Sequence, residues 1–161
     1  MNKEEQFQNI YYKNYPNVIR LCLGYVNGRE DLAKDLAQEV FIKVWQNLQS
    51  FRNNSNISTW IYRITVNTCL QELRRKKVKH LTLNIAADKT INPDEKEDQF
   101  MEMYRCINTL SSDNKTIILL ELENVPQLEI AQITGISHQA VRTRIHRIKE
   151  QLSKCVTYEK F

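Results

Sequence analysis

Glycine and proline are scarce in this chain, with only three of each among its 161 residues. So few turn-forming residues leave little material for the many tight turns of a β-sandwich or a β-barrel. Hydrophobic residues make up 42% of the chain and charged residues 26%, as in ordinary globular proteins, which argues against a disordered or collagen-like chain. We therefore expect an all-α protein.

A long apolar run is also missing. No window of the sequence approaches the roughly 20 apolar residues that a membrane span needs. Residues 1–6 hold no apolar stretch behind a basic start, which argues against a signal peptide. We therefore expect a cytoplasmic protein that does not insert into the membrane.

The cysteines show no metal-site spacing. Cys22, Cys69, Cys106 and Cys155 form no CxxC pair and do not stand beside a histidine at ligand spacing. We expect them to be small buried residues in a reducing compartment, without a metal or redox role. No cofactor is predicted, and no nucleophile, paired-carboxylate or glycine-rich phosphate motif indicates an enzyme.

The formal net charge of +4 is unevenly distributed. Residues 1–80 carry 13 basic and 7 acidic side chains, residues 81–104 carry 2 and 6, and residues 105–161 carry 8 and 6. The acidic segment contains Pro93 and has weak hydrophobic periodicity, which is typical of a linker. An ordered loop leading into an acidic helix start is the alternative. We expect two small helical domains, residues 1–80 and 99–161, joined by a linker over residues 81–98.

Two helices are predicted first in the N-terminal half. Apolar spacing indicates one helix over residues 7–25, interrupted at Pro16, and a second from Asp31 to about Leu48 with a broad core face. Opposite that core face lie Asp35, Gln38, Glu39, Ile42, Trp45 and Gln49. Apolar groups among polar ones indicate a docking surface for a partner protein, and burial of both sides in a bundle is the alternative.

A third helix is predicted to begin near Ser58 or Thr59, with a hydroxyl cap. Its far face and the segments that flank it combine an aromatic ring, amides and arginines: Arg52, Asn53, Asn54, Ser55, Asn56, Trp60, Arg63, Asn67, Gln71, Arg74 and Arg75. Cationic groups hold phosphates, rings stack on bases and amides read base edges, so we expect a nucleic-acid surface. A solvated basic helix end is the alternative.

The C-terminal half has a helix-turn-helix layout. A buried helix stops at Asn124, Pro126 opens a short helix that Gly135 ends, and Ser137 caps a helix running to about Leu152. The last helix has a polar and basic face: Ser137, His138, Gln139, Arg142, Thr143, Arg144, His146, Arg147 and Lys149. This composition is typical of a recognition helix in a major groove, and a basic helix that packs on a protein is the alternative.

Several segments in one order resemble the bacterial sigma-70 family of RNA polymerase sigma factors, and specifically its extracytoplasmic function (ECF) group. They are residues 31–45 (DLAKDLAQEVFIKVW), Phe51-Arg52 followed by residues 59–67 (TWIYRITVN), and residues 129–147. The resemblance implies that the N-terminal domain is sigma region 2 and the C-terminal domain sigma region 4. It also implies core RNA polymerase, promoter DNA and a cognate anti-sigma factor as partners.

The resemblance further implies a role for each predicted surface. Asp35, Gln38, Glu39 and Trp45 correspond to the surface that docks on the clamp helices of the polymerase β′ subunit, and the β flap is a second polymerase contact. Residues 52–56 and the stripe with Asn67 correspond to elements that capture an unstacked base of the minus-ten element. The helix from Ser137 corresponds to the reader of the minus-thirty-five element. Ile61 stands where housekeeping members carry a second tryptophan, which implies weak melting of promoters by this chain alone.

Two other functions remain open from the residues. One is a stand-alone helix-turn-helix transcriptional regulator whose N-terminal half dimerises or senses a signal, which predicts stable homodimers on a symmetric site. The other is a helical protein-interaction adaptor, which predicts no salt-sensitive binding to DNA.

Overall fold

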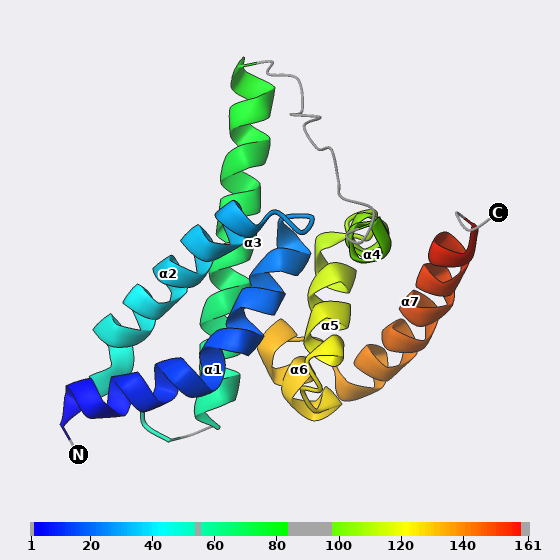
Figure 1. Ribbon diagram of the computed structural model, residues 1–161. Helices are drawn as coiled ribbons and strands as arrows, with labels where there is room; N and C mark the ends of the chain where they lie inside the picture. Colours follow the sequence, from blue (N-terminus) through cyan, green and yellow to red (C-terminus); the bar gives the residue numbers. More distant parts are fainter. Residues whose placement is uncertain (1, 54–55, 84–97, 159–161) are drawn as a thin grey trace.

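Seven α-helices and one short 3₁₀ helix form the computed structural model, which describes residues 2–53, 56–83 and 98–158 (Figure 1). The α-helices are α1 (Lys3–Tyr25), α2 (Glu30–Asn47), α3 (Ile57–Leu83), α4 (Asp98–Ile107), α5 (Ser112–Leu122), α6 (Gln127–Thr134) and α7 (His138–Tyr158), with the 3₁₀ helix at Leu48–Ser50. These ranges contain no strand, so the all-α prediction is confirmed. None of their helices combines the length and the apolar character that a membrane span requires.

The first helix is longer than predicted and is not interrupted at Pro16. The Asn2 side chain caps it by accepting a hydrogen bond from the backbone N–H of Glu5 at 2.8 Å. Proline lacks an N–H and crowds the carbonyl of the residue four positions earlier, which bends a helix without necessarily ending it. The N-terminal and C-terminal parts of α1 run in different directions in Figure 1, so the helix is bent. Pro16 itself is exposed. The helix ends at Tyr25, as predicted, and the turn that follows contains Asn27 and Gly28, both with positive φ.

Helices α1, α2 and α3 pack around one buried core. Tyr62, Val66 and Cys69 of α3 are buried in it, while the second half of α3 extends beyond the other helices (Figure 1). The start of α3 differs from the prediction. The helix begins at Ile57, and its cap is the side chain of Asn56, whose Oδ1 accepts the Ser58 N–H at 3.1 Å.

Helices α5, α6 and α7 have the predicted helix-turn-helix arrangement. Ser111 caps α5, Gly135 ends α6 with φ of 75°, and the Ser137 hydroxyl accepts the Ala140 N–H at 3.1 Å at the start of α7. Val141, Ile145, Ile148 and Leu152 form a buried stripe along α7. This helix runs to Tyr158, six residues beyond its predicted end, and α4 packs against it. The described part of the predicted linker belongs to the ends of α3 and α4, and residues 84–97 lie outside the described residues.

The expectation for the cysteines is wrong for one pair. Cys106 of α4 and Cys155 of α7, which are 49 positions apart in sequence, form a disulfide. The spacing of cysteines along a chain does not reveal which helices become neighbours, and α4 and α7 are adjacent only in the folded chain. Cys22 and Cys69 are buried free thiols, as predicted.

The C-terminal helices pack directly on the N-terminal bundle. Helix α5 lies against α1, and α6 against α3 (Figure 1). The Arg20 guanidinium and the Glu123 carboxylate form an ion pair at 2.8 Å, and the hydroxyls of Tyr25 and Thr116 are hydrogen-bonded. Burial raises the pKa of Tyr25, so this hydroxyl keeps its proton. These polar groups at the contact between the two halves are therefore paired.

A chain of hydrogen bonds also crosses this interface. The Lys115 ammonium donates to the Asn108 side-chain carbonyl at 2.9 Å, and the Asn108 amide donates to the Gly24 carbonyl at 3.1 Å. Burial lowers the pKa of Lys115, whose charge is compensated by this hydrogen bond. Gly24 itself lies under Leu119, and a Cβ at this position would be 2.2 Å from the nearest Leu119 methyl carbon.

The Gly24→Ala substitution is expected to weaken the packing of the two halves. The added methyl group would force the Leu119 side chain to move, and overpacking of this kind costs about 1–3 kcal/mol. Small-angle X-ray scattering should show a larger radius of gyration for the variant. The double variant Gly24→Ala/Leu119→Ala removes the clash and should regain part of the compactness. A double variant no more compact than the single variant would contradict this explanation.

Candidate functional site

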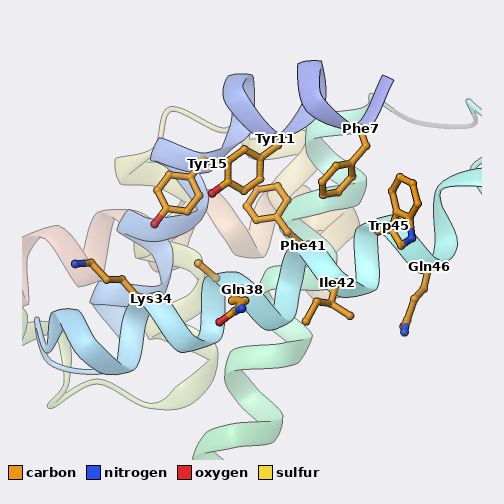
Figure 2. Close-up of a pocket in the computed structure, with 10 residues that line it drawn as sticks. Phe7, Tyr11, Tyr15, Lys34, Gln38, Phe41, Ile42, Trp45 and Gln46 are labelled. Carbon is orange, nitrogen blue, oxygen red and sulfur yellow. The ribbon is translucent and has the colours of Figure 1, made fainter. Parts of the chain in front are cut away.

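An aromatic groove of about 510 Å³ lies between α1 and α2 (Figure 2). Its lining residues are Phe7, Tyr11, Tyr15, Lys34, Ala37, Gln38, Phe41, Ile42, Trp45 and Gln46. The rings contact one another edge to face, with 5.3 Å between the ring centroids of Phe7 and Trp45 and 4.8 Å between those of Tyr11 and Phe41. Such contacts fix the rings in place, so the groove is preformed.

Three residues of the predicted docking surface line this groove. Ile42 is 51% exposed and Trp45 36%, and both stand at its edge, Ile42 next to Gln38 and Trp45 next to Phe7 (Figure 2). Burial of this side of α2 inside a bundle, which was the alternative, is therefore wrong. The Lys3 ammonium lies 4.1 Å from the Trp45 ring centroid, so the groove ends next to a positive charge.

The other three residues of that predicted surface lie elsewhere, and Gln49 among them is exposed on the 3₁₀ helix. Asp35 and Glu39 border a smaller depression between α2 and α3, together with Glu72 and Arg75. Glu39 is paired with Lys43 at 3.7 Å, and Arg75 with Glu72 at 3.0 Å. The hydrogen bond to the Glu72 carboxylate raises the pKa of the Arg75 guanidinium. The structure thus divides the predicted surface into an apolar part and a charged part.

Sequence reasoning missed the wall that α1 contributes to the groove. The apolar spacing that predicted the first helix gave Phe7, Tyr11 and Tyr15 no functional role, yet they line the groove opposite α2. Their spacing of four residues places all three rings on one stripe of the helix. Aromatic residues at positions i, i+4 and i+8 were the signal that could have identified this wall.

The predicted nucleic-acid stripe is present along α3. Arg63, Asn67, Gln71 and Arg74 are exposed, while Trp60 is partly buried, with 5.0 Å between its ring centroid and that of Phe51. Ile61 is completely buried, so it offers no ring or side chain to a base at the position after Trp60. Arg63 also donates a hydrogen bond to the Gln132 carbonyl of α6 at 3.3 Å. One member of the stripe is thus engaged by the C-terminal half.

The loop before α3 is described only in part. Arg52, Asn53 and Asn56 are exposed, and Asn53 has φ of 53°. The side-chain oxygen of Asn56 is occupied by the hydrogen bond that caps α3. Asn54 and Ser55, which belong to the predicted minus-ten site, lie outside the described residues.

The outer face of α7 carries most of the second predicted DNA surface. Gln139, Arg142, Thr143, His146 and Arg147 line one shallow depression, and Ser137 and Arg144 an adjoining one. His138 is exposed at the start of the helix, and the Ser137 hydroxyl is occupied by its capping hydrogen bond. Lys149 departs from this group, because its ammonium lies 3.4 Å from the Glu121 carboxylate of α5. Among the described residues, no cluster of three or more histidine, cysteine, aspartate or glutamate side chains could hold a metal.

Comparison with known proteins decides the family. Sigma-70 region 2 matches residues 10–78, and sigma-70 region 4 matches residues 100–152. The RNA polymerase sigma factor SigV of Bacillus subtilis is 33% identical, over 80% of this chain and 77% of the relative. The ECF RNA polymerase sigma-E factor of Escherichia coli is also 33% identical, over 95% of this chain and 87% of the relative. The chain belongs to the ECF group of the sigma-70 family.

Solved structures agree with this ECF sigma fold. A sigma factor RpoE in complex with the anti-sigma factor NepR, from Bartonella quintana, has a TM-score of 0.81 and 20% identity, over 95% of this chain and 98% of that one. CnrH in complex with the cytosolic domain of CnrY has a TM-score of 0.73 and 18% identity, over 96% and 90%. Sigma factors are non-enzymatic initiation factors of transcription that work with RNA polymerase and bind promoter DNA. The surfaces described above therefore belong to a protein that acts by binding.

Proposed function

We propose that this sigma factor acts in the cytoplasm and directs core RNA polymerase to a restricted set of promoters. Residues 1–80 bind the polymerase and the minus-ten element, residues 81–98 link the domains, and residues 99–161 bind the minus-thirty-five element. The observation that carries the proposal is the exposure of Ile42 and Trp45 at the edge of a preformed aromatic groove. Family membership argues against the stand-alone regulator and the adaptor.

The groove is assigned to the clamp helices of the polymerase β′ subunit. A groove between two helices accepts the apolar face of a third helix, whose side chains insert at positions one turn apart. Buried aromatic anchors contribute most of the binding energy in such interfaces, and Trp45 is the largest exposed side chain here. Asp35 and Glu39 lie on the neighbouring depression, where they add charge to the rim of the same interface.

The stripe of α3 is assigned to the minus-ten element. Extruding a base from the duplex costs a few kcal/mol, which stacking and hydrogen bonds must offset. Trp60 presents a ring for stacking, Asn67 and Gln71 present amides, and Arg52, Arg63, Arg74 and Arg75 present positive charge to phosphates. Asn53, Asn54, Ser55 and Asn56 complete the proposed site as the loop that holds the extruded base.

The outer face of α7 is assigned to the minus-thirty-five element. Gln139 and Arg142 near its N-terminus contact base edges, and Arg144 and His146 reach toward the backbone on either side. Arg147 lies within reach of either target. Ser137 and His138 lie at the helix start, where backbone N–H groups face a phosphate. Thr143 supplies a methyl group and a hydroxyl between the basic residues, and Lys149 joins the contact only if it leaves Glu121.

A cognate anti-sigma factor is part of the proposal. The solved RpoE structure was determined with the anti-sigma factor NepR and the CnrH structure with the cytosolic domain of CnrY, and their fold extends over nearly all of this chain. The β flap of the polymerase is proposed as a second contact, through the C-terminal domain. Transcription in vitro with core polymerase on genomic fragments tests the proposal. Stable homodimers that bind a symmetric DNA site without polymerase would contradict it.

The Trp45→Ala substitution is expected to weaken the binding of core polymerase about 30-fold or more, as expected for the loss of an aromatic anchor. Fluorescence polarisation of the labelled full-length chain, titrated with core polymerase, measures this change. Glu39→Lys should also weaken binding, through its charge. Tyr12→Ala is the matched control, because Tyr12 is 75% exposed on α1 but does not line the groove. Equal losses of polymerase and DNA binding would overturn the docking assignment.

A further inference from the structure

The disulfide of the C-terminal half joins two helices with different neighbours. Cys106 is fully buried near the end of α4, and Cys155 is partly exposed on the last turns of α7. Their Cα atoms lie 6.1 Å apart, within the ordinary range for a disulfide. Since Cys155 is the less buried of the two residues, we take its sulfur atom as the point at which a small thiol attacks.

The second cysteine pair lacks this access. The sulfur atoms of Cys22 and Cys69 lie 3.8 Å apart, but both residues are fully buried between α1 and α3. The contact with Cys22, together with burial, raises the pKa of Cys69 well above its usual value. Such a thiol stays protonated and unreactive. Redox chemistry is thus confined to Cys106 and Cys155.

Helix α4 connects this disulfide to the interface between the two halves. An ideal Cβ on Gly28, in the turn between α1 and α2, would lie 2.7 Å from the Tyr104 ring and 2.9 Å from the Met101 sulfur. Asn108, directly after α4, donates to the Gly24 carbonyl at 3.1 Å. One side of α4 is therefore bonded to α7, and another side packs on the N-terminal bundle.

We propose that the Cys106–Cys155 disulfide is a redox-sensitive brace that favours the packed arrangement of the two halves. When the bond is formed, α4 is held on α7 in the position from which Met101, Tyr104 and Asn108 contact the N-terminal bundle. A surface that is already ordered loses less conformational freedom on docking. Reduction frees α4 when the halves separate, which favours the open state.

The chemistry is thiol–disulfide exchange with a low-molecular-weight thiol and its disulfide. In reduction, a thiolate attacks the Cys155 sulfur, the bond to Cys106 breaks, and Cys106 leaves as a thiolate that takes up a proton. A second thiolate attacks the added sulfur, which releases the small disulfide and the Cys155 thiol. Two small thiols are thus oxidised to one small disulfide while the protein gains two thiols, and oxidation is the reverse.

The consequence for DNA binding rests on the proposed function. In the packed arrangement the Arg63 guanidinium donates to the Gln132 carbonyl of α6, so part of the α3 stripe is engaged by the C-terminal half. Separation of the two halves releases Arg63. It also lets the two DNA surfaces take the spacing that a promoter requires. Oxidising conditions should therefore lower promoter binding, and reducing conditions should raise it.

Hydrogen–deuterium exchange of the full-length protein, in buffers of reduced and oxidised glutathione, tests the brace. Peptides over residues 21–28 and 116–123 report on the interface. In the wild type their exchange should rise about tenfold on reduction, while Cys106→Ser/Cys155→Ser should exchange fast in both buffers. Cys69→Ala is the matched control, since it removes a thiol but keeps the brace and should respond as the wild type does.

Alkylation followed by mass spectrometry measures the state of the cysteines in the same samples. Complete alkylation of Cys106 and Cys155 in oxidised glutathione would show that no disulfide forms and would overturn the proposal. Equal hydrogen–deuterium exchange of the interface peptides in the two buffers would also overturn it. A uniform rise over residues 98–158 would also contradict it, because it reports loss of domain stability. These readouts use the wild type alone if the double variant does not fold. If the wild type bound no core polymerase in either buffer, the proposed function would be contradicted. The exchange result on the packing of the two halves would still stand.

Discussion

Replacing Trp60 by alanine is expected to reduce promoter opening about 5- to 150-fold, since a base stacked on an aromatic side chain gains about 1–3 kcal/mol. Its ring lies against Phe51 and remains partly exposed at the start of α3, beside the loop proposed to hold the extruded base. The duplex must give up stacking within the DNA, and this ring supplies the replacement. Permanganate footprinting of the bubble formed by the holoenzyme measures the effect.

Two further variants separate stacking from folding. Trp60→Phe keeps a ring and should retain most of the opening activity. Asn67→Ala removes an exposed amide on the same stripe and should reduce opening more than it reduces polymerase affinity, without disturbing the core. Thermal unfolding of Trp60→Ala shows how much stability is lost with the Phe51 contact. An open bubble of wild-type intensity in Trp60→Ala would rule out the stacking role.

The secondary structure could be predicted from the sequence where local rules act alone. Gly135, with its left-handed backbone, and Ser137, with its capping hydroxyl, fix the ends of α6 and α7 within a few residues of chain. Pro16 shows where such rules stop. Proline disfavours a helix interior locally, yet burial of Val18, Leu21 and Cys22 further along α1 stabilises a continuous, bent helix.

Of the docking surface, the sequence predicted the side formed by α2 but not the wall formed by α1. Period analysis of one helix identifies the side that faces away from the core, which is how Ile42 and Trp45 were found. It does not show which other helix borders that side. The aromatic wall of α1 and the separate position of Asp35 and Glu39 depend on how three helices pack, which no single periodic pattern contains.

Contacts between the two halves were beyond sequence reasoning altogether. Arg20 and Glu123 are 103 positions apart, and Tyr25 and Thr116 are 91 positions apart. The sequence around each of these four residues does not indicate which distant residue it contacts. The same holds for Cys106 and Cys155, so the sequence interpretation missed both the packing of the halves and the bond that stabilises one side of it.

The Arg147→Ala substitution should weaken promoter binding by the holoenzyme about 5- to 150-fold if Arg147 reads a base, with relaxed specificity at one position of the minus-thirty-five element. If it contacts a phosphate, the loss should be uniform across sequences. The dependence of log affinity on log salt should then fall by about 1. Its guanidinium is exposed at the junction of the two shallow depressions of α7, which places it within reach of either target.

Lys154→Ala is the matched control for this test. Lys154 is an exposed cation on the same helix, two turns further along, and it borders neither depression. A general electrostatic effect of the basic C-terminal half would lower affinity equally in both variants, because each loses one positive charge. Binding measured on one promoter fragment over a range of salt concentrations separates the two cases. Equal losses would assign α7 to non-specific attraction, and a selective loss in Arg147→Ala supports recognition by this face of the helix.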